Sequence, residues 1–222
     1  MRLTRIVLPT RDLDATARYY RDTLGLPVDA GPTSATVTVG ATTLVFEPRP
    51  YEGDQHLAFT IPTGSFAAAK RWIAGRSTLL TGDGLDEFEG SPAWNSRSVY
   101  FDGPDGQVLE LIERRALDNG FGGEFGPDSI LCVSEVGIAV PDVGAAVEQL
   151  RTAGATPYAN PPGPQFAAVG DVHGLLILVA PGRGWMPTGD RYAASSPVTV
   201  HAHGVRATRL TADQTVLDAA TS

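Results

Sequence analysis

His56 and Glu110 are the residues of this 222-residue chain best suited to metal chemistry. His56 lies in the stretch QHLAFTIP at 55–62, and Glu110 lies in VYFDGPDGQVLELIE at 99–113. A neutral imidazole and a carboxylate are ligands that divalent transition metals prefer. On a strand, Glu110 falls between two branched apolar residues, and a carboxylate in such surroundings needs a partner. His56, a metal ion or Arg5 could serve as that partner.

Three stretches of the sequence predict the elements that would position these residues. They begin at Leu3, Gln55 and Ser134. Each indicates an alternating strand, a turn with proline, a capping residue and an amphipathic helix ended by glycine. Asp12 is the predicted cap of the first helix, and Asp142 is that of the third. The chain is therefore built from repeats of one supersecondary unit.

Each predicted strand has one bulky face and one face that is small or polar. Arg5, His56 and Glu135 stand at the first position of the polar faces, and small residues such as Ala58 and Gly137 follow. A packed core requires side-chain volume. Faces of this kind therefore indicate a cavity or a ligand surface.

Antiparallel strands follow each predicted helix. The hairpins are expected at residues 34–48, 96–114 and 166–181, with turns near Gly40, at GPDG and near His173–Gly174. The sequence thus predicts an α+β fold made of repeated βαβββ modules.

The stretches IVLPTRDLDATARYYRDTLGL, HLAFTIP and VYFDGPDGQVLELIE resemble the vicinal oxygen chelate superfamily, which includes glyoxalase I, fosfomycin- and bleomycin-resistance proteins and extradiol dioxygenases. In that superfamily two modules pair so that their sheets form a cup. The resemblance implies two paired modules at 1–115, a linker at 116–129, and a third, partial module with a C-terminal strand at 130–222.

The resemblance also implies four ligand positions on the first and last strands of the paired modules, namely Arg5, Val45, His56 and Glu110. A guanidinium stays protonated and offers only donors, so Arg5 opposes a cation, and Val45 has no ligand atom. Three interpretations stay open: a site for manganese, iron, nickel or zinc on His56 and Glu110, a metal-free pocket with Arg5 as an anion anchor, and a structural ion pair.

The third module is expected to repeat the fold without the chemistry. Glu135 stands at its first ligand position, but Leu178 stands at the position equivalent to Glu110. One carboxylate alone does not make a metal site. The tail has strand character at Val198–Val200 and is expected to complete the sheet of this third module.

Trp94, Asn95 and Tyr100 are candidates, with Arg5, for binding a small molecule. Trp94 and Asn95 stand just before a predicted strand, where they would line a pocket opening or, equally, cover the edge of the core and form a turn. Tyr100 alternates with Phe101, and the spacing leaves open which of the two faces the cup.

The composition excludes several classes of function. The net charge of −8 and the isoelectric point of about 4.9 disfavour nucleic-acid binding. One cysteine, an N-terminal stretch with charges where a secretion signal is apolar, and the absence of a long apolar run favour a cytoplasmic protein without a membrane span. Superfamily members often pair modules across subunits, which makes a homodimer an expected partner arrangement.

Two functions follow. The first is a small-molecule pocket in the cup of residues 3–115 whose metal site is incomplete because Arg5 replaces a ligand. The second is a metal-dependent lyase or extradiol-type dioxygenase that uses His56 and Glu110, with Glu110 also serving as a catalytic proton shuttle.

Overall fold

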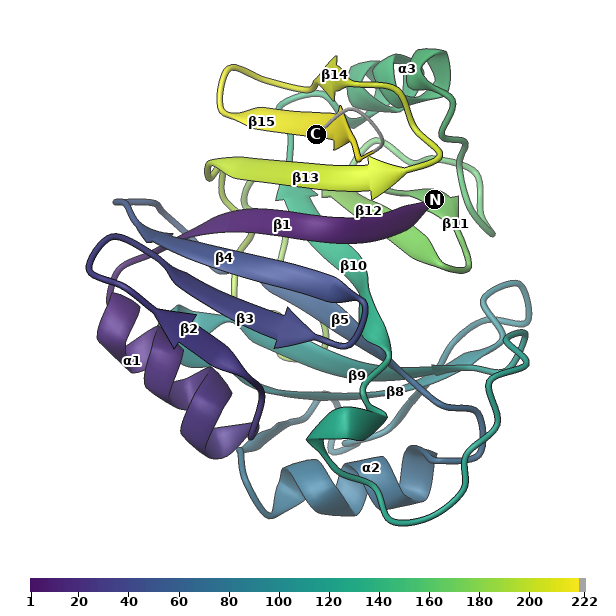
Figure 1. The fold of residues 1–222 in the computed structure, drawn as a ribbon. Coiled ribbons are helices and arrows are strands. Elements are labelled where there is room, and N and C mark those ends of the chain that lie inside the picture. Colours follow the sequence, from purple (N-terminus) through teal and green to yellow (C-terminus); the bar gives the residue numbers. More distant parts are fainter. Residues whose placement is uncertain (220–222) are drawn as a thin grey trace.

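The computed structural model describes residues 1–219, and two β-sheets dominate it (Figure 1). The strands of the first sheet, in spatial order, are β14 (Thr208–Arg209), β15 (Gln214–Asp218), β13 (Val198–His203), β1 (Arg2–Thr10), β4 (Thr42–Pro48), β3 (Ala35–Val39) and β2 (Val28–Ala30). Those of the second sheet are β11 (Phe166–Asp171), β12 (Gly174–Val179), β10 (Cys132–Ala139), β5 (His56–Ile61), β9 (Val108–Arg114), β8 (Ser96–Asp102) and β6 (Leu79–Leu80), and β7 (Phe88–Glu89) pairs with β8.

One α-helix follows the first strand of each of the three modules. These helices are α1 (Leu13–Arg18), continued by a π-helix at Tyr19–Thr23, α2 (Phe66–Ala74) and α3 (Val143–Ala153). The carboxylate of Asp12 accepts a hydrogen bond from the backbone N–H of Ala15, and Asp142 does the same for Ala145. Gly154 ends α3 with φ of 106°, a conformation that favours glycine. The predicted caps are therefore confirmed.

One apolar core fills the space between the two sheets and under the helices. Ile6 and Leu44 of the first sheet, Phe59 and Leu111 of the second, and Tyr20 beside α1 are all fully buried in it. These residues come from the bulky faces of the strands. The opposite face of the second sheet carries a separate apolar cluster, and this face forms the cup.

The pairing of the modules differs from the expectation. β5 runs antiparallel beside β10, with Leu57 opposite Val136, so the second module shares its sheet with the third. β1 runs antiparallel beside β13, with Ile6 opposite Val200, so the first module shares its sheet with the C-terminal strands. The expected single cup within residues 1–115 is therefore wrong, as is the placement of the tail beside the third module. The first strands have the same alternating pattern, so the pattern does not specify which of them pair.

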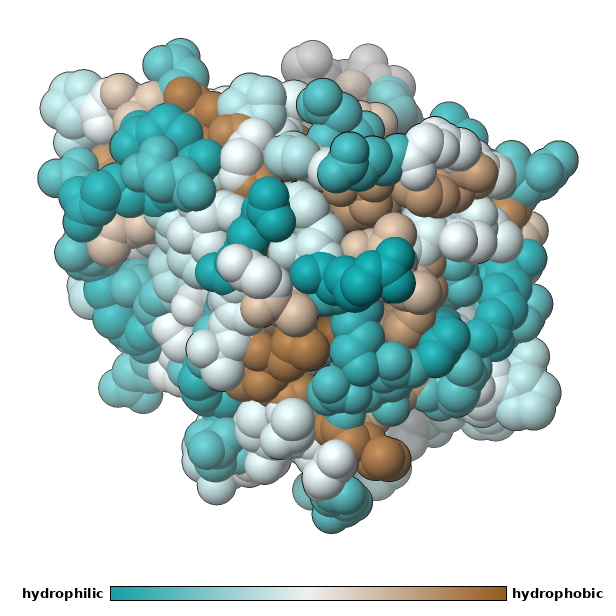
Figure 2. All heavy atoms as spheres, turned by 90° about the horizontal axis from the view of Figure 1, so that it is seen from below, coloured by the Kyte–Doolittle hydropathy of each residue, from teal (hydrophilic) through white to brown (hydrophobic). Residues whose placement is uncertain are grey.

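Residues 116–129 connect β9 to β10. This segment contains a 3₁₀ turn at Pro127–Ser129, and its Phe125 is buried against Trp72 of α2. Seen from the side of α2, the surface is mostly hydrophilic, with apolar atoms in small separate patches (Figure 2). Within residues 1–219, none of the helices has both the length and the apolar character that a bilayer span needs.

Candidate metal centre and ligand cavity

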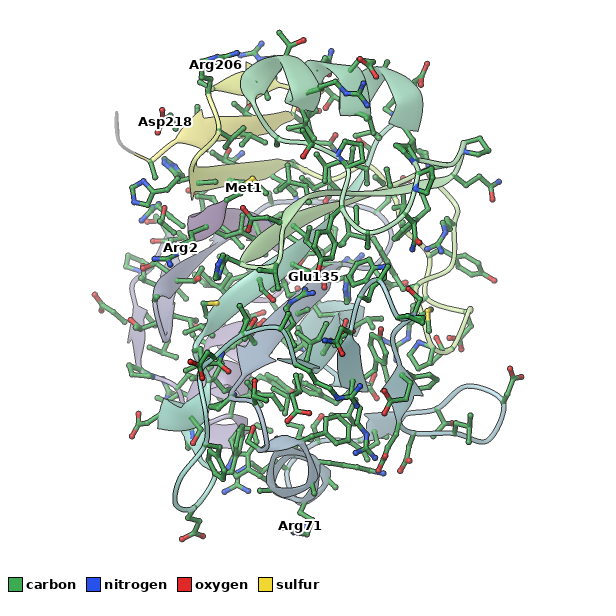
Figure 3. All side chains as sticks on the ribbon, turned by 90° about the vertical axis from the view of Figure 1, so that its right-hand side faces the viewer. Met1, Arg2, Arg71, Glu135, Arg206 and Asp218 are labelled. Atoms are coloured by element: carbon green, nitrogen blue, oxygen red, sulfur yellow. The ribbon has the colours of Figure 1, made fainter. Side chains whose placement is uncertain are left out.

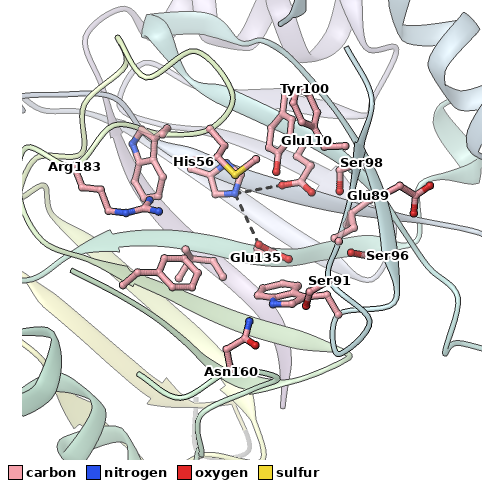
Figure 4. A pocket seen from close by; sticks show the side chains of 18 residues that line it. His56, Glu89, Ser91, Ser96, Ser98, Tyr100, Glu110, Glu135, Asn160 and Arg183 are labelled. Carbon is pink, nitrogen blue, oxygen red and sulfur yellow. Dashed lines mark ion pairs between the residues drawn. The ribbon is translucent and has the colours of Figure 1, made fainter. Parts of the chain in front are cut away.

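The cup of the second sheet brings His56, Glu110 and Glu135 together (Figure 4). Ala58 of β5 lies opposite Glu110 of β9 on one side and opposite Glu135 of β10 on the other. His56 lies two residues before Ala58 and so shares its face. All three side chains are buried, with exposed fractions of 3–6%. Figure 3 shows Glu135 in the interior, while Arg71 and Arg206 lie at the two ends of the molecule.

The three side chains have ligand atoms at distances that suit one metal ion. His56 Nε2 lies 3.5 Å from Glu110 Oε2 and 3.9 Å from Glu135 Oε2, and one ligand atom of each residue lies within 4.8 Å of the others. Ligand atoms about 2.1 Å from a tetrahedral metal ion are about 3.4 Å apart. The donor set of one imidazole and two carboxylates therefore fits a divalent cation.

The hydrogen bond at the other ring nitrogen fixes the orientation of His56. Nδ1 lies 3.1 Å from the carbonyl oxygen of Val108, which only accepts, so Nδ1 carries a proton. Nε2 then faces the carboxyl groups of Glu110 and Glu135, whose ionised forms only accept. A proton or a cation between these atoms satisfies all three groups, and this arrangement is typical of metal-binding histidines.

Arg114 holds Glu135 on the side away from His56. Its Nη2 donates to Glu135 Oε1, and both side chains are buried. Although burial opposes ionisation, Arg114 and His56 keep the pKa of Glu135 below its usual value. Burial alone would lower the pKa of His56, but Glu135 and Glu110 outweigh that effect and raise it. Glu135 is therefore an ionised carboxylate, ready to bind a cation.

Glu110 differs from Glu135 in its charge state. Burial, with the nearby charge of Glu135, raises its pKa to about 7. The hydroxyls of Ser98 and Tyr100 are hydrogen-bonded to it. Burial, followed by the charges of Glu110 and Glu135, raises the pKa of the Tyr100 phenol far above its usual value, so the phenol stays protonated. Glu110 can thus take up or release a proton near neutral pH.

Ile177 occupies the fourth ligand position of this cup. It lies on β12 opposite Gly137, as Glu110 lies opposite Ala58. The prediction that Leu178 is equivalent to Glu110 was therefore wrong by one residue. Leu178 faces the core between the sheets. An apolar residue here leaves three protein ligands, so positions of a bound metal ion would be open to a substrate.

A cavity of about 380 Å³ opens in front of the three ligands. Ser96, Ser98 and Ile112 contribute to its floor, and several aromatic side chains contribute to its walls. The aromatic residues that line it are Phe88, Trp94, Tyr100, Phe166 and Trp185. Such a volume lies at the small end of ligand pockets, which range over about 300–1,000 Å³.

Residues 180–196, which we name the strap, close one side of the cavity. The indole Nε1 of Trp185 donates to the backbone oxygen of Asp54 at 2.8 Å, and the Asp54 carboxylate accepts from the backbone N–H of Tyr192 at 2.9 Å. The ring of Trp185 lies 5.3 Å from that of His56. A Cβ on Gly137 would lie 2.5 Å from the Trp185 ring, so glycine at this position allows the contact. The strap therefore belongs to the site.

Arg5 lies outside the site. It is exposed on β1 of the first sheet, between Thr43 of β4 and His201 of β13, and it does not line the cavity. Val45 also lies in the first sheet. Placing Arg5 beside His56 and Glu110 was wrong, because the first module contributes to the other sheet. The objection that Arg5 raised against a metal ion therefore does not apply.

Of the other predicted ligand-binding residues, two line the cavity and one does not. Trp94 and Tyr100 line the cavity, and the Trp94 ring packs edge-on against Tyr158 at 5.4 Å. Asn95 is exposed, has φ of 46° and accepts a backbone hydrogen bond from Arg115, so it forms the turn before β8. Tyr100, rather than Phe101, faces the cup.

Sequence reasoning missed Glu135, Arg114 and Trp185 as parts of one site. The repeat had placed Glu135 at a first ligand position. A prediction that paired the second module with the third would have brought this carboxylate beside His56. Arg114 continues the alternation of Glu110 and Ile112 along β9, so its face was readable. Trp185 lies in an irregular segment with no periodic signal.

Comparisons with known proteins identify solved structures with a similar fold. No family model matches the sequence, and no curated protein matches it. Among solved structures, the putative dioxygenase from Bacillus subtilis subsp. subtilis str. 168 has a TM-score of 0.59 at 18% identity, over 91% of this chain and 70% of that one. Glyoxalase I from Zea mays has a TM-score of 0.53 at 19% identity, over 90% of this chain and 74% of that one. The chain therefore shares the fold of these two proteins, which is the fold that its motifs predicted.

Proposed function

We propose that this chain binds a divalent metal ion on His56, Glu110 and Glu135 and acts on a small molecule that offers two neighbouring oxygen atoms. The observation that carries the proposal is His56 Nε2, which faces two buried carboxylates at 3.5 and 3.9 Å. When bound, the ion would supply Lewis acidity, which polarises a carbonyl group. This replaces the incomplete site that Arg5 implied.

The protein's own residues would orient the substrate and move a proton. The aromatic walls and the strap would limit the access of water to a substrate bound in the cup. Glu110 Oε1 or Oε2, with a pKa of about 7 before metal binding, would accept a proton from the carbon next to the polarised group. The protonated phenol of Tyr100 would donate a hydrogen bond to Glu110 and hold it in place.

The donor set favours a lyase or isomerase over a ring-cleaving dioxygenase. Ferrous oxygenases typically use two histidines and one carboxylate. His56 is the one histidine that lines the cavity in the described chain, and two carboxylates accompany it. A set rich in oxygen donors suits Lewis-acid chemistry without a change of oxidation state, with manganese, nickel or zinc as the ion.

Metal content and two assays test the proposal. Plasma mass spectrometry of purified protein, before and after chelation and reloading, should give one ion per chain. The loaded protein should exchange the α-proton of α-hydroxyketones for deuterium, seen by NMR, and should consume no oxygen with catechols. Oxygen uptake with catechols, and no exchange, would instead favour the dioxygenase.

A matched pair of variants controls for the site. Glu135→Gln should lower metal affinity by at least about 100-fold. Loss of a residue that only orients a metal ligand costs about 10- to 100-fold, and loss of a ligand itself should cost more. Thr199→Val, at the equivalent position of the first sheet, should leave affinity unchanged. A chain that binds none of manganese, iron, nickel and zinc would refute the proposal.

The remaining expectations stay predictions. A small-molecule ligand is the partner that the cavity favours. A homodimer and a cytoplasmic location rest on the sequence considerations alone, and sedimentation analysis and cell fractionation would test them.

A further inference from the structure

Arg183 is a cation in the cavity wall that pairs with no acidic side chain within residues 1–219. It projects from the strap and is half-buried. Its guanidinium lies 5.0 Å from the centroid of the Phe166 ring, and Nη1 makes a long, 3.4 Å hydrogen bond to the neighbouring carbonyl of Gly184. Partial burial lowers the pKa of this guanidinium below its usual value. Most of its donors are therefore free to bind a ligand.

The other arginines around the cup have acidic partners. Arg97 and Arg115 pair with Glu89 on the rim, and Arg114 pairs with Glu135 below it. Arg191, also on the strap, pairs with Asp102 at 2.7 Å. Arg183 differs from these in having its charge uncompensated next to a cavity, where an anion would gain most from it.

Figure 4 shows how Arg183 lies relative to the candidate metal ligands. Its guanidinium and the amide of Asn160 point toward the cavity from edges away from Glu110. The cavity thus has donors at the two edges from which Arg183 and Asn160 project, and carboxylates at Glu110 and Glu135. A ligand that spans it meets opposite polarity at its two ends.

The walls between these ends suit a flat apolar group. Phe88, Trp94, Phe166 and Trp185 supply rings on several sides, and the volume is about 380 Å³. Aromatic walls favour planar ligands that stack or pack edge-on. The volume suits a molecule with one or two rings.

We infer that the cavity selects a small planar carboxylic acid, whose carboxylate binds Arg183 and whose ring lies between the aromatic walls. The opposite, oxygen-bearing end would face His56, Glu110 and Glu135, and only that part rests on the proposed function. A carboxylate matches the two parallel donors of a guanidinium. A dianionic phosphate would be repelled more strongly by the acidic residues of the cup, so a singly charged group is favoured.

Calorimetry with two pairs of ligands, each a carboxylic acid and its uncharged amide, tests the inference. The first pair is 4-methylbenzoate and 4-methylbenzamide with the protein as purified. The second is 3,4-dihydroxybenzoate and its amide with zinc-loaded protein. The wild-type chain should bind each acid roughly 10- to 100-fold more tightly than its amide, the range for a hydrogen-bonded charge. Arg183→Gln should remove this preference and leave amide binding unchanged, which also shows that the variant folds.

Arg151→Gln is the matched control, because Arg151 is 54% exposed on α3 and outside the cavity. It should keep the preference for the acids. A preference that survives in Arg183→Gln, a wild-type chain without preference, or a chain that binds neither probe of the first pair would overturn the inference. If zinc does not bind but 4-methylbenzoate still depends on Arg183, the proposed function fails and the carboxylate site stands.

Discussion

The two sheets contain the same strand pattern but differ in chemistry. In the second sheet, Ala58 lies between Glu110 and Glu135. In the first sheet, Val7 lies in the same way between Val45 and Thr199. The four equivalent positions are His56, Glu110, Glu135 and Ile177 in the second sheet, and Arg5, Val45, Thr199 and Leu217 in the first.

The sheets also differ in what covers them. The strap places Trp185 against His56 and encloses the cup of the second sheet. The corresponding face of the first sheet is toward the viewer in Figure 1, with no helix or strand drawn across it. Arg5 there is exposed, whereas Arg114 in the second sheet is fully buried. A repeated backbone therefore does not repeat a site, because the ligands and the enclosure are set by separate residues.

The largest expected effect is on stability. Arg114→Met removes the partner of a buried carboxylate and should lower the free energy of unfolding of the metal-free protein by about 3 kcal/mol. Arg5→Met, at an exposed position of the first sheet, should change it by less than about 0.5 kcal/mol. Urea unfolding of both variants would measure the difference. Equal losses would show that the two arginines do not differ in this way.

The pH dependence of metal binding should show an intermediate effect. Glu110 has a pKa raised to about 7 and must lose its proton to bind a cation. Loss of the Glu110 proton alone should therefore raise the affinity about fivefold from pH 6 to 7 and about twofold more above pH 7, because the ionised fraction of Glu110 is about one tenth at pH 6 and one half at pH 7. Calorimetry in two buffers of different ionisation heat should show release of at least one proton at pH 6 and less at pH 8. Equal proton release at both values would contradict the assignment.

The smallest expected effect comes from copying the ligands into the first sheet. The triple variant Arg5→His, Val45→Glu, Thr199→Glu should gain a second, weaker metal site, because the register is the same but water competes on an exposed face. Equilibrium dialysis should show two ions per chain, with the second at least about tenfold weaker. The single variant Arg5→His should show one ion. A triple variant that folds and still binds one ion would show that register alone is insufficient.

Much of the local structure was readable from the sequence. Alternation predicted β5 and β10, Asp12 and Asp142 predicted helix starts, and GPDG predicted the turn between β8 and β9. These signals depend on neighbours a few residues apart. The shared face of Glu110 and Ile112 was equally local. The irregular strap gave no such signal, so Trp185 and Arg183 were out of reach.

The sequence by itself determined the repeated modules and the side of each strand on which His56, Glu110 and Glu135 lie. Only the tertiary structure decided that the second module pairs with the third, which puts Glu135 beside His56 and Arg5 in the other sheet. The physical reason is that strand edges offer the same backbone donors and acceptors in every module. Which edges meet is settled by the packing of the whole chain, while which face a residue takes is settled by its own strand.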